Sequence, residues 1–153
     1  EWNEICTEIL EKRAKRRALY ILQRMERTEY QLRQKLQENG YPEEIVQCAI
    51  DYVKSFHYVD DYRYACTYIR YYQTEKSRLQ LKMKLYERGV ASDLIEQALE
   101  DEYSGEEEQL IDRLLEKKHY DAETMDQKEK QRIYQYLMRR GFRPETIRHR
   151  MGI

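Results

Sequence analysis

One phrase of the sequence occurs three times with the same spacing. The phrase begins with an apolar residue and has leucine four positions later and glycine four positions after the leucine. A second apolar residue follows the glycine directly, and Val or Ile stands six positions after the glycine. The three copies are centred on Gly40, Gly89 and Gly141. Apolar residues four apart share one face of a helix, and a glycine after the last turn takes the left-handed conformation that ends a helix. Each copy therefore predicts a helix, a tight turn and a second helix.

The starts of these helices are marked as well. Thr28 and Ser77 each stand three residues before a glutamine, which is the pattern of a capping box. In the third copy the predicted start is Asp126, three residues before Glu129. A hydroxyl or carboxylate at such a position accepts a hydrogen bond from an otherwise unpaired amide of the first turn. The same local signals thus delimit the three copies.

A further helix is predicted before each pair. Apolar residues follow helical spacing from Leu10 to Met25, from residues 62 to 72 and from residues 110 to 115. The second of these helices follows Asp60 and Asp61, adjacent carboxylates that suit the start of a helix. The third is predicted to open at Ser104, three residues before Glu107.

The pattern predicts an all-α fold of three tandem three-helix repeats. We expect these at residues 1–58, 59–103 and 104–153, the last with a short or truncated final helix. A unit of this size cannot bury its apolar face alone, so the repeats should pack end to end as an elongated, curved array.

Composition limits the cellular setting. The three cysteines are odd in number and form no closely spaced pair, which favours a reducing cytoplasm over a disulfide scaffold. We expect no membrane segment, because no apolar run approaches the ~18 residues of a transmembrane helix. The net charge is −1, but five cations lie within residues 12–17, five acids within residues 101–108, and more cations near the C-terminal end.

An enzymatic site is not expected. Asp60 and Asp61 are neighbours that point in different directions from a helix start, so capping explains them better than paired acid–base catalysis. His57, His119 and His149 share no spacing that would hold a metal or form a catalytic triad. The chain also lacks a glycine-rich phosphate loop. We therefore predict a non-enzymatic protein without cofactor or metal.

Two stretches of the chain resemble a known family. They are the basic helix "RAKRRALYILQRMERTEYQLRQKL" and the junction "YVDDYRYACTYI", whose Asp-Asp-x-Arg-aromatic-Ala core runs from Asp60 to Ala65. Together with the Leu-x3-Gly turns, these resemble the RecX family, bacterial regulators of the RecA recombinase. The resemblance implies a modulator that binds in the groove of the RecA–single-stranded-DNA filament and restrains filament growth, ATP hydrolysis and strand exchange. It implies roles in recombination, DNA repair and the SOS response, and we expect a monomer.

A surface that enters such a filament should present cations and rigid aromatic rings near phosphates. We expect the binding residues to be Arg13, Arg16, Arg17, Arg24, Arg63, Tyr64, Tyr68, Arg70, Arg139, Arg140 and Arg143. For the tyrosines, packing of a helix buried on both sides is an equally open interpretation. If the helix presents its cations to the filament, Arg63→Glu combined with Arg70→Glu should leave folding intact and weaken filament binding.

Two other functions stay open. The helix, glycine turn and helix of the third copy, "RRGFRPETIRHR", can be interpreted as a helix-turn-helix DNA-binding module that acts without RecA, with direct DNA binding of its own. Against it, the first two copies are not basic after their turns. The other is a helical scaffold for a different protein partner.

Overall fold

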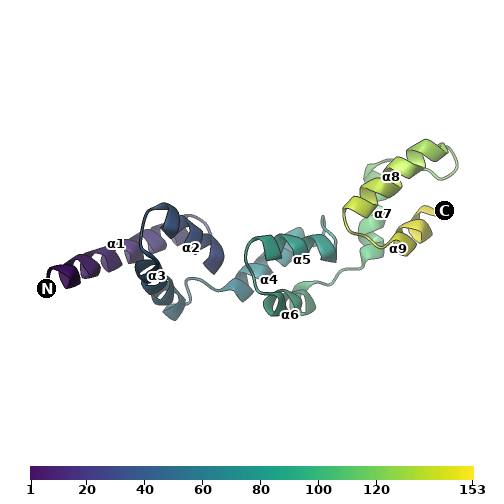
Figure 1. The fold of residues 1–153 in the computed structure, drawn as a ribbon. Coiled ribbons are helices and arrows are strands. Elements are labelled where there is room, and N and C mark those ends of the chain that lie inside the picture. Colours follow the sequence, from purple (N-terminus) through teal and green to yellow (C-terminus); the bar gives the residue numbers. More distant parts are fainter. The chain divides into compact units, whose positions relative to one another are not determined.

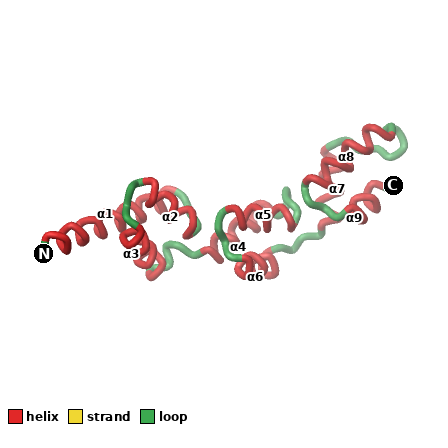
Figure 2. Tube along the Cα trace, in the orientation of Figure 1, coloured by secondary structure: helices red, strands yellow, loops and turns green.

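The computed structural model describes all 153 residues and consists of helices and turns, without β-strands (Figures 1 and 2). The predicted all-α class is confirmed. The helices are α1 (Trp2–Arg24), α2 (Glu29–Glu38), α3 (Glu43–Ser55), α4 (Asp61–Tyr72), α5 (Arg78–Glu87), α6 (Ser92–Glu102), α7 (Glu107–Lys117), α8 (Gln127–Arg139) and α9 (Pro144–Met151). None of them combines the length and the apolar character needed to cross a bilayer.

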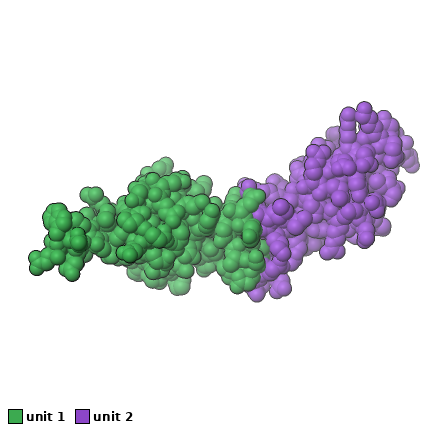
Figure 3. Space-filling model, viewed as in Figure 1, with its two compact units in different colours: residues 1–65, 85–95 green, residues 66–84, 96–153 purple.

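The chain divides into two compact units (Figure 3). Unit 1 comprises residues 1–65 and 85–95, and unit 2 comprises residues 66–84 and 96–153. The division passes through α4, α5 and α6, so the middle helices contribute residues to both units.

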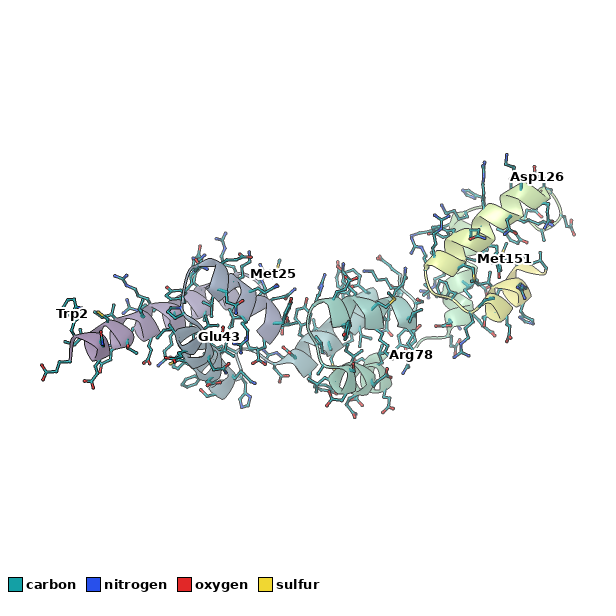
Figure 4. The ribbon with its side chains drawn as sticks, in the orientation of Figure 1. Trp2, Met25, Glu43, Arg78, Asp126 and Met151 are labelled. Atoms are coloured by element: carbon teal, nitrogen blue, oxygen red, sulfur yellow. The ribbon has the colours of Figure 1, made fainter.

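In unit 1, α2 and α3 pack against the C-terminal half of α1 (Figure 1). Ala14 and Ala18 are fully buried in α1, where their small side chains allow the other helices to approach closely. The first turns of α1 lie beyond this packing, and Trp2 at their start is exposed (Figure 4). The predicted apolar stripe ends earlier than expected: α1 stops at Arg24, and Met25 is an exposed residue in extended conformation.

In unit 2, α7, α8 and α9 enclose a second core. Its fully buried members are Ile111, Leu137, Ile147 and Met151. The Tyr120 hydroxyl donates to the carbonyl of Met151 at 2.7 Å, which fixes the end of α9. This last helix has eight residues and still buries Ile147 and Met151.

The three repeated glycines end their helices as predicted. Gly40, Gly89 and Gly141 have φ values of 86°, 86° and 88°. In each copy the backbone amide of the residue after the glycine donates to the carbonyl of the leucine four positions before the glycine. An example is the bond from Val90 to Leu85 at 3.1 Å. A left-handed glycine with this bond satisfies a carbonyl that the helix end would leave unpaired.

The predicted helix starts are confirmed in all three copies. The side chains of Thr28, Ser77 and Asp126 each accept a hydrogen bond from the amide three residues later, at 3.1, 3.2 and 2.8 Å. The start predicted at Ser104 is wrong, because α7 begins only at Glu107. The amide and hydroxyl of Ser104 both donate to the Gln73 side-chain oxygen at 3.2 Å, so this serine has a different partner.

The two hydroxyl caps also form a joint with the following repeat. Thr28 Oγ1 donates to the carbonyl of Arg88 at 2.6 Å in unit 1, and Ser77 Oγ donates to that of Arg140 at 2.5 Å in unit 2. Both hydroxyl residues are fully buried. In each case the acceptor is the residue just before a turn glycine. The same joint is therefore built twice, from a capping hydroxyl and the glycine turn of the next repeat.

Candidate functional site

The cations of the chain fall into a paired and an unpaired set. Arg33 contacts Glu43 at 2.5 Å, Arg70 contacts Glu102 at 3.1 Å, and Arg150 binds Asp112 with two nitrogens. Glu96 takes two cations, Arg78 at 3.3 Å and Lys82 at 2.5 Å. Paired cations are largely neutralised locally, so the unpaired ones decide which external anions the protein attracts.

Arg63, a predicted site residue, has a structural role. Its guanidinium donates to Glu26 at 3.1 Å and to the carbonyl of His57 at 2.8 Å, in the turn after α3. His57 has a φ of 58°, a left-handed conformation that is uncommon outside glycine. Arg63→Glu would remove these bonds and place a carboxylate beside Glu26. The structure therefore argues against the expectation that this substitution leaves folding intact.

The adjacent carboxylates of the junction are caps, as predicted, but of two different helices. Asp60 accepts from the amide of Arg63 at 3.0 Å and opens α4. Asp61 reaches another helix and accepts from the amide of Glu29 at 2.9 Å, at the start of α2. Burial raises the pKa of the Asp61 carboxyl, with the Glu29 amide bond opposing this effect. The Asp-Asp-x-Arg phrase thus connects α2, α3 and α4.

Two of the predicted site tyrosines are buried. Tyr64 is 9% exposed and Tyr68 is 6% exposed, so neither ring is open to a partner. The Tyr64 hydroxyl accepts from Arg88 at 2.5 Å in unit 1. In unit 2 the Tyr68 hydroxyl accepts from Lys76 at 2.9 Å. These contacts agree with the packing interpretation. On the same helix Tyr71 is 75% exposed, although the sequence pattern did not distinguish it from the other two.

The predicted arginines of α1 form no ion pairs. Arg13, Arg16, Arg17 and Arg24 are all exposed. The guanidinium carbons of Arg17 and Arg24 lie 5.2 and 5.5 Å from the ring centre of Tyr20, and Arg24 also donates to its hydroxyl at 2.7 Å. A guanidinium held against a ring keeps its charge while losing little mobility on binding an anion. This face of α1 is a candidate anion-binding surface.

The predicted arginines near the end of α8 are also without carboxylate partners. The Arg140 guanidinium lies 4.6 Å from the ring centre of Tyr136 and donates to the carbonyl of Glu75 at 3.3 Å. Arg139 and Arg143 are exposed. Arg140 lines two hollows together with cations that the sequence pattern did not indicate, because they come from other elements: Lys76, Arg113 and Lys117. Only the tertiary fold brings them near α8.

No group of three or more His, Cys, Asp or Glu residues is placed to hold a metal ion. The candidate site consists of exposed cations without carboxylate partners, on α1 in unit 1 and around α7 and α8 in unit 2.

Comparison with known proteins connects these features to a family. Models of the first, second and third three-helix domains of RecX match residues 14–52, 60–99 and 106–150, in chain order. A regulatory protein RecX of Caldanaerobacter subterraneus subsp. tengcongensis is 33% identical over 144 residues, which cover 93% of this chain and 71% of the relative. The chain belongs to the RecX family. The predicted resemblance and the predicted tandem three-helix repeats are thereby confirmed.

Other relatives define how far the match extends. A regulatory protein RecX of Clostridium acetobutylicum is 31% identical over 135 residues, which cover 84% of this chain and 63% of the relative. The chain thus spans under two thirds of the length of that relative. A crystal structure of regulatory protein RecX superposes with a TM-score of 0.84 at 24% identity, covering 99% of this chain and 76% of the other. At that identity the likeness shows the fold. Both of these relatives are named regulatory proteins.

Proposed function

We propose that this chain is a non-enzymatic regulator of homologous recombination and DNA repair. It binds in the groove of the RecA filament on single-stranded DNA and restrains filament extension, ATP hydrolysis and strand exchange. The observation that carries the proposal is the ordered match of all three RecX domain models. RecA and its DNA are cytoplasmic, so we place the protein there, acting as a monomer.

The distribution of unpaired charge supports this proposal. A nucleoprotein filament exposes phosphates along its groove, and a ligand for it needs cations that its own carboxylates do not neutralise. The chain offers them on α1 and around the end of α8. We therefore assign the filament contacts to Arg13, Arg16, Arg17, Arg24, Arg139, Arg140 and Arg143. In α4, Arg63, Tyr64 and Tyr68 support packing instead.

We also propose repeat boundaries at residues 1–58, 59–103 and 104–153. Each boundary falls in a connection between helix triplets, α3 to α4 and α6 to α7. The joints described above then link consecutive repeats through Thr28 and Ser77.

Inhibition of RecA's DNA-dependent ATP hydrolysis tests the proposal. Substoichiometric amounts of the chain should suppress hydrolysis by RecA on single-stranded DNA, because one regulator in the groove affects many protomers. Filament length in electron micrographs should fall over the same concentrations. If the chain leaves hydrolysis unchanged at every ratio, the proposed function is wrong.

A helix-turn-helix module that acts without RecA is less well supported. In unit 2 the turn at Gly141 packs on Leu79 and Ser77 of the preceding repeat, so part of the motif serves the joint. In α9, the helix that would enter a DNA groove, Arg150 binds Asp112 and is neutralised by it. One of the two arginines of this helix is therefore not available for DNA.

A further inference from the structure

We propose that Asp126 and Lys128, at the start of α8, prevent a second copy of this chain from docking there by its Gly40 turn. Within the chain, a helix start and a glycine turn join twice, at Thr28 in unit 1 and at Ser77 in unit 2. Each half of this joint also occurs once without its partner. Gly40 is a turn with no helix start against it, and Asp126 is an exposed helix start.

Both joints use two side chains of the helix start. The capping hydroxyl donates to the carbonyl before the glycine, and the residue two positions after the cap lies against the glycine itself. A Cβ built on Gly89 would lie 2.2 Å from the Cβ of Tyr30, and one built on Gly141 would lie 3.1 Å from the Cβ of Leu79. The joint therefore combines a hydroxyl at the cap with an apolar side chain two positions later.

The Gly40 turn has the backbone for a third joint. Its φ of 86° equals that of Gly89, and no atom beyond its chain neighbours lies within 4 Å of a Cβ built on it. The carbonyl of Asn39 corresponds to the acceptors of Arg88 and Arg140. Asn39 is exposed, whereas both of those arginines are half-buried. The turn therefore offers the same acceptor, in the same conformation, to a helix start from outside the chain.

The start of α8 has the matching backbone but different side chains. Asp126 accepts from the amide of Glu129 at 2.8 Å, so this helix is capped like the other two (Figure 4). Its carboxylate has no proton to donate, so docking would bring two acceptors together and remove a charge from water. Lys128 stands where Tyr30 and Leu79 meet a glycine, and its ammonium would also lose its hydration. A turn from another copy therefore finds no bond here to offset these losses.

Such a block matters because the two free halves of the joint lie on different surfaces of the chain. A head-to-tail contact of this kind lets copies add one after another unless the geometry closes a ring. Terminal units of repeat proteins need a polar outer face for the same reason. Asp126 and Lys128 supply that polarity at the start of α8. The contact joins copies of the chain without RecA, so it is independent of the proposed function.

Sedimentation velocity from micromolar to near-millimolar concentrations tests the block. The test variant, Asp126→Ser with Lys128→Leu, gives α8 the hydroxyl and the apolar residue of the other joints and keeps a capping side chain. The reversal variant adds Gly40→Asn, because asparagine tolerates the left-handed conformation and its side chain fills the open space at the turn. It retains the new leucine, so non-specific association through that leucine would survive in it. Circular dichroism checks that the variants fold.

We expect the parent chain to stay monomeric over this range. The test variant should self-associate at least about tenfold more tightly, because docking gains a hydrogen bond and no longer buries two charges. Asp126→Ser alone, which exchanges one cap for another, should give part of this gain, and the reversal variant should be monomeric again. The proposal is overturned if the parent associates as tightly as the test variant, if the test variant stays monomeric, or if the reversal variant still associates.

Discussion

At the scale of single residues, a buried hydroxyl serves two helices at once. Thr28 and Ser77 each accept from an amide of their own helix and donate to a carbonyl at the end of a later helix. A carboxylate can accept but cannot donate. Asp126, the equivalent cap in the third copy, is exposed and makes only the first of these bonds. A hydroxyl residue therefore stands at the capping position where the glycine turn of a later repeat packs on it, and an aspartate stands where no such turn does.

Ser77→Ala should cost more stability than Asp126→Ala. Both substitutions remove a helix cap, which is worth about 1 kcal/mol. Ser77→Ala also removes the donor to the carbonyl of Arg140, in a part-buried bond, for about 1–2 kcal/mol more. Urea unfolding followed by circular dichroism gives both free energies of unfolding. Equal losses in the two variants would show that the hydroxyl contributes nothing to the joint.

Asp61→Asn should change how stability depends on pH. Burial raises the pKa of Asp61, so the folded protein holds this proton more tightly than the unfolded chain. The contribution of Asp61 to stability is therefore greatest below its ordinary pKa of 3.8 and falls as pH rises through the higher folded value. Asparagine keeps the acceptor for the Glu29 amide without titrating. Relative to the parent, the variant should gain stability from pH 3.8 towards neutrality.

Asp121→Asn provides a control with the opposite sign. The amide of Glu123 donates to this carboxylate at 2.9 Å and lowers its pKa. The ionised form is favoured in the folded protein, so its contribution is present above the ordinary pKa and is lost as pH falls. Asp121→Asn should lose stability relative to the parent as pH rises. Urea unfolding at several pH values compares the two, and matching trends would contradict the assignment for Asp61.

At the scale of elements, the same glycine turn serves different surroundings. Gly40 and Gly89 share a φ of 86°, yet space is open around Gly40. A Cβ at Gly89 would overlap the side chain of Tyr30. The turn at Gly40 thus only ends its helix. The turn at Gly89 also lets Tyr30 of the first repeat pack directly against the backbone of the second repeat. The repeated phrase predicted the conformation of both turns but not this difference in packing.

Gly89→Ala should therefore destabilise the protein more than Gly40→Ala. Both variants force a side chain into the left-handed region, at about 1–2 kcal/mol. Gly89→Ala must in addition displace Tyr30 from the joint with α2, for which overpacking costs of ~1–3 kcal/mol are typical. Thermal and urea unfolding of the two variants measure the difference. If they unfold at the same denaturant concentration, the close approach at Gly89 is not needed for the joint.

The helix α4 shows where a sequence pattern is insufficient at this scale. Its apolar stripe predicted one buried face, and Ala65 and Ile69 are indeed fully buried. Tyr64 and Tyr68 lie on the other side by helical spacing and are buried too, while Tyr71 is exposed. Periodicity indicates which face of a helix is most apolar. Whether the opposite face is also buried depends on other helices that pack against it and that lie far away in the chain.

At the scale of the whole molecule, function depends on which cations remain unpaired. Unit 1 pairs Arg33, Lys35 and Lys54 with acids, but leaves the arginines of α1 unpaired. Unit 2 likewise pairs Arg150 with Asp112 and leaves Arg139 and Arg143 at the end of α8 without carboxylate partners. A net charge of −1 conceals this separation, because the total counts paired and unpaired residues alike.

Neutralising the arginines of α1 should weaken inhibition of RecA without affecting folding. The variant carries Arg13→Gln, Arg16→Gln and Arg17→Gln, all at exposed positions. Each loses about 0.5 kcal/mol of attraction to the filament, which together raises the concentration for half-inhibition of ATP hydrolysis about tenfold. The control neutralises the same number of paired cations in unit 1: Arg33, Lys35 and Lys54. If both variants shift inhibition equally, net charge rather than the α1 surface is responsible.

The sequence by itself determined the repeated helix, turn and helix, the glycine conformation and the capping residues. These depend on contacts within a few positions, where spacing and residue type are sufficient. Only the tertiary structure decided that Thr28 and Ser77 bond to carbonyls 60 and 63 residues away, and that Arg63 holds the turn after α3. It also decided which cations contact carboxylates, as Arg70 contacts Glu102, and which lie together around α7 and α8, as Arg113, Lys117 and Arg140 do. Such partners are set by how the helices pack, and no local pattern encodes them.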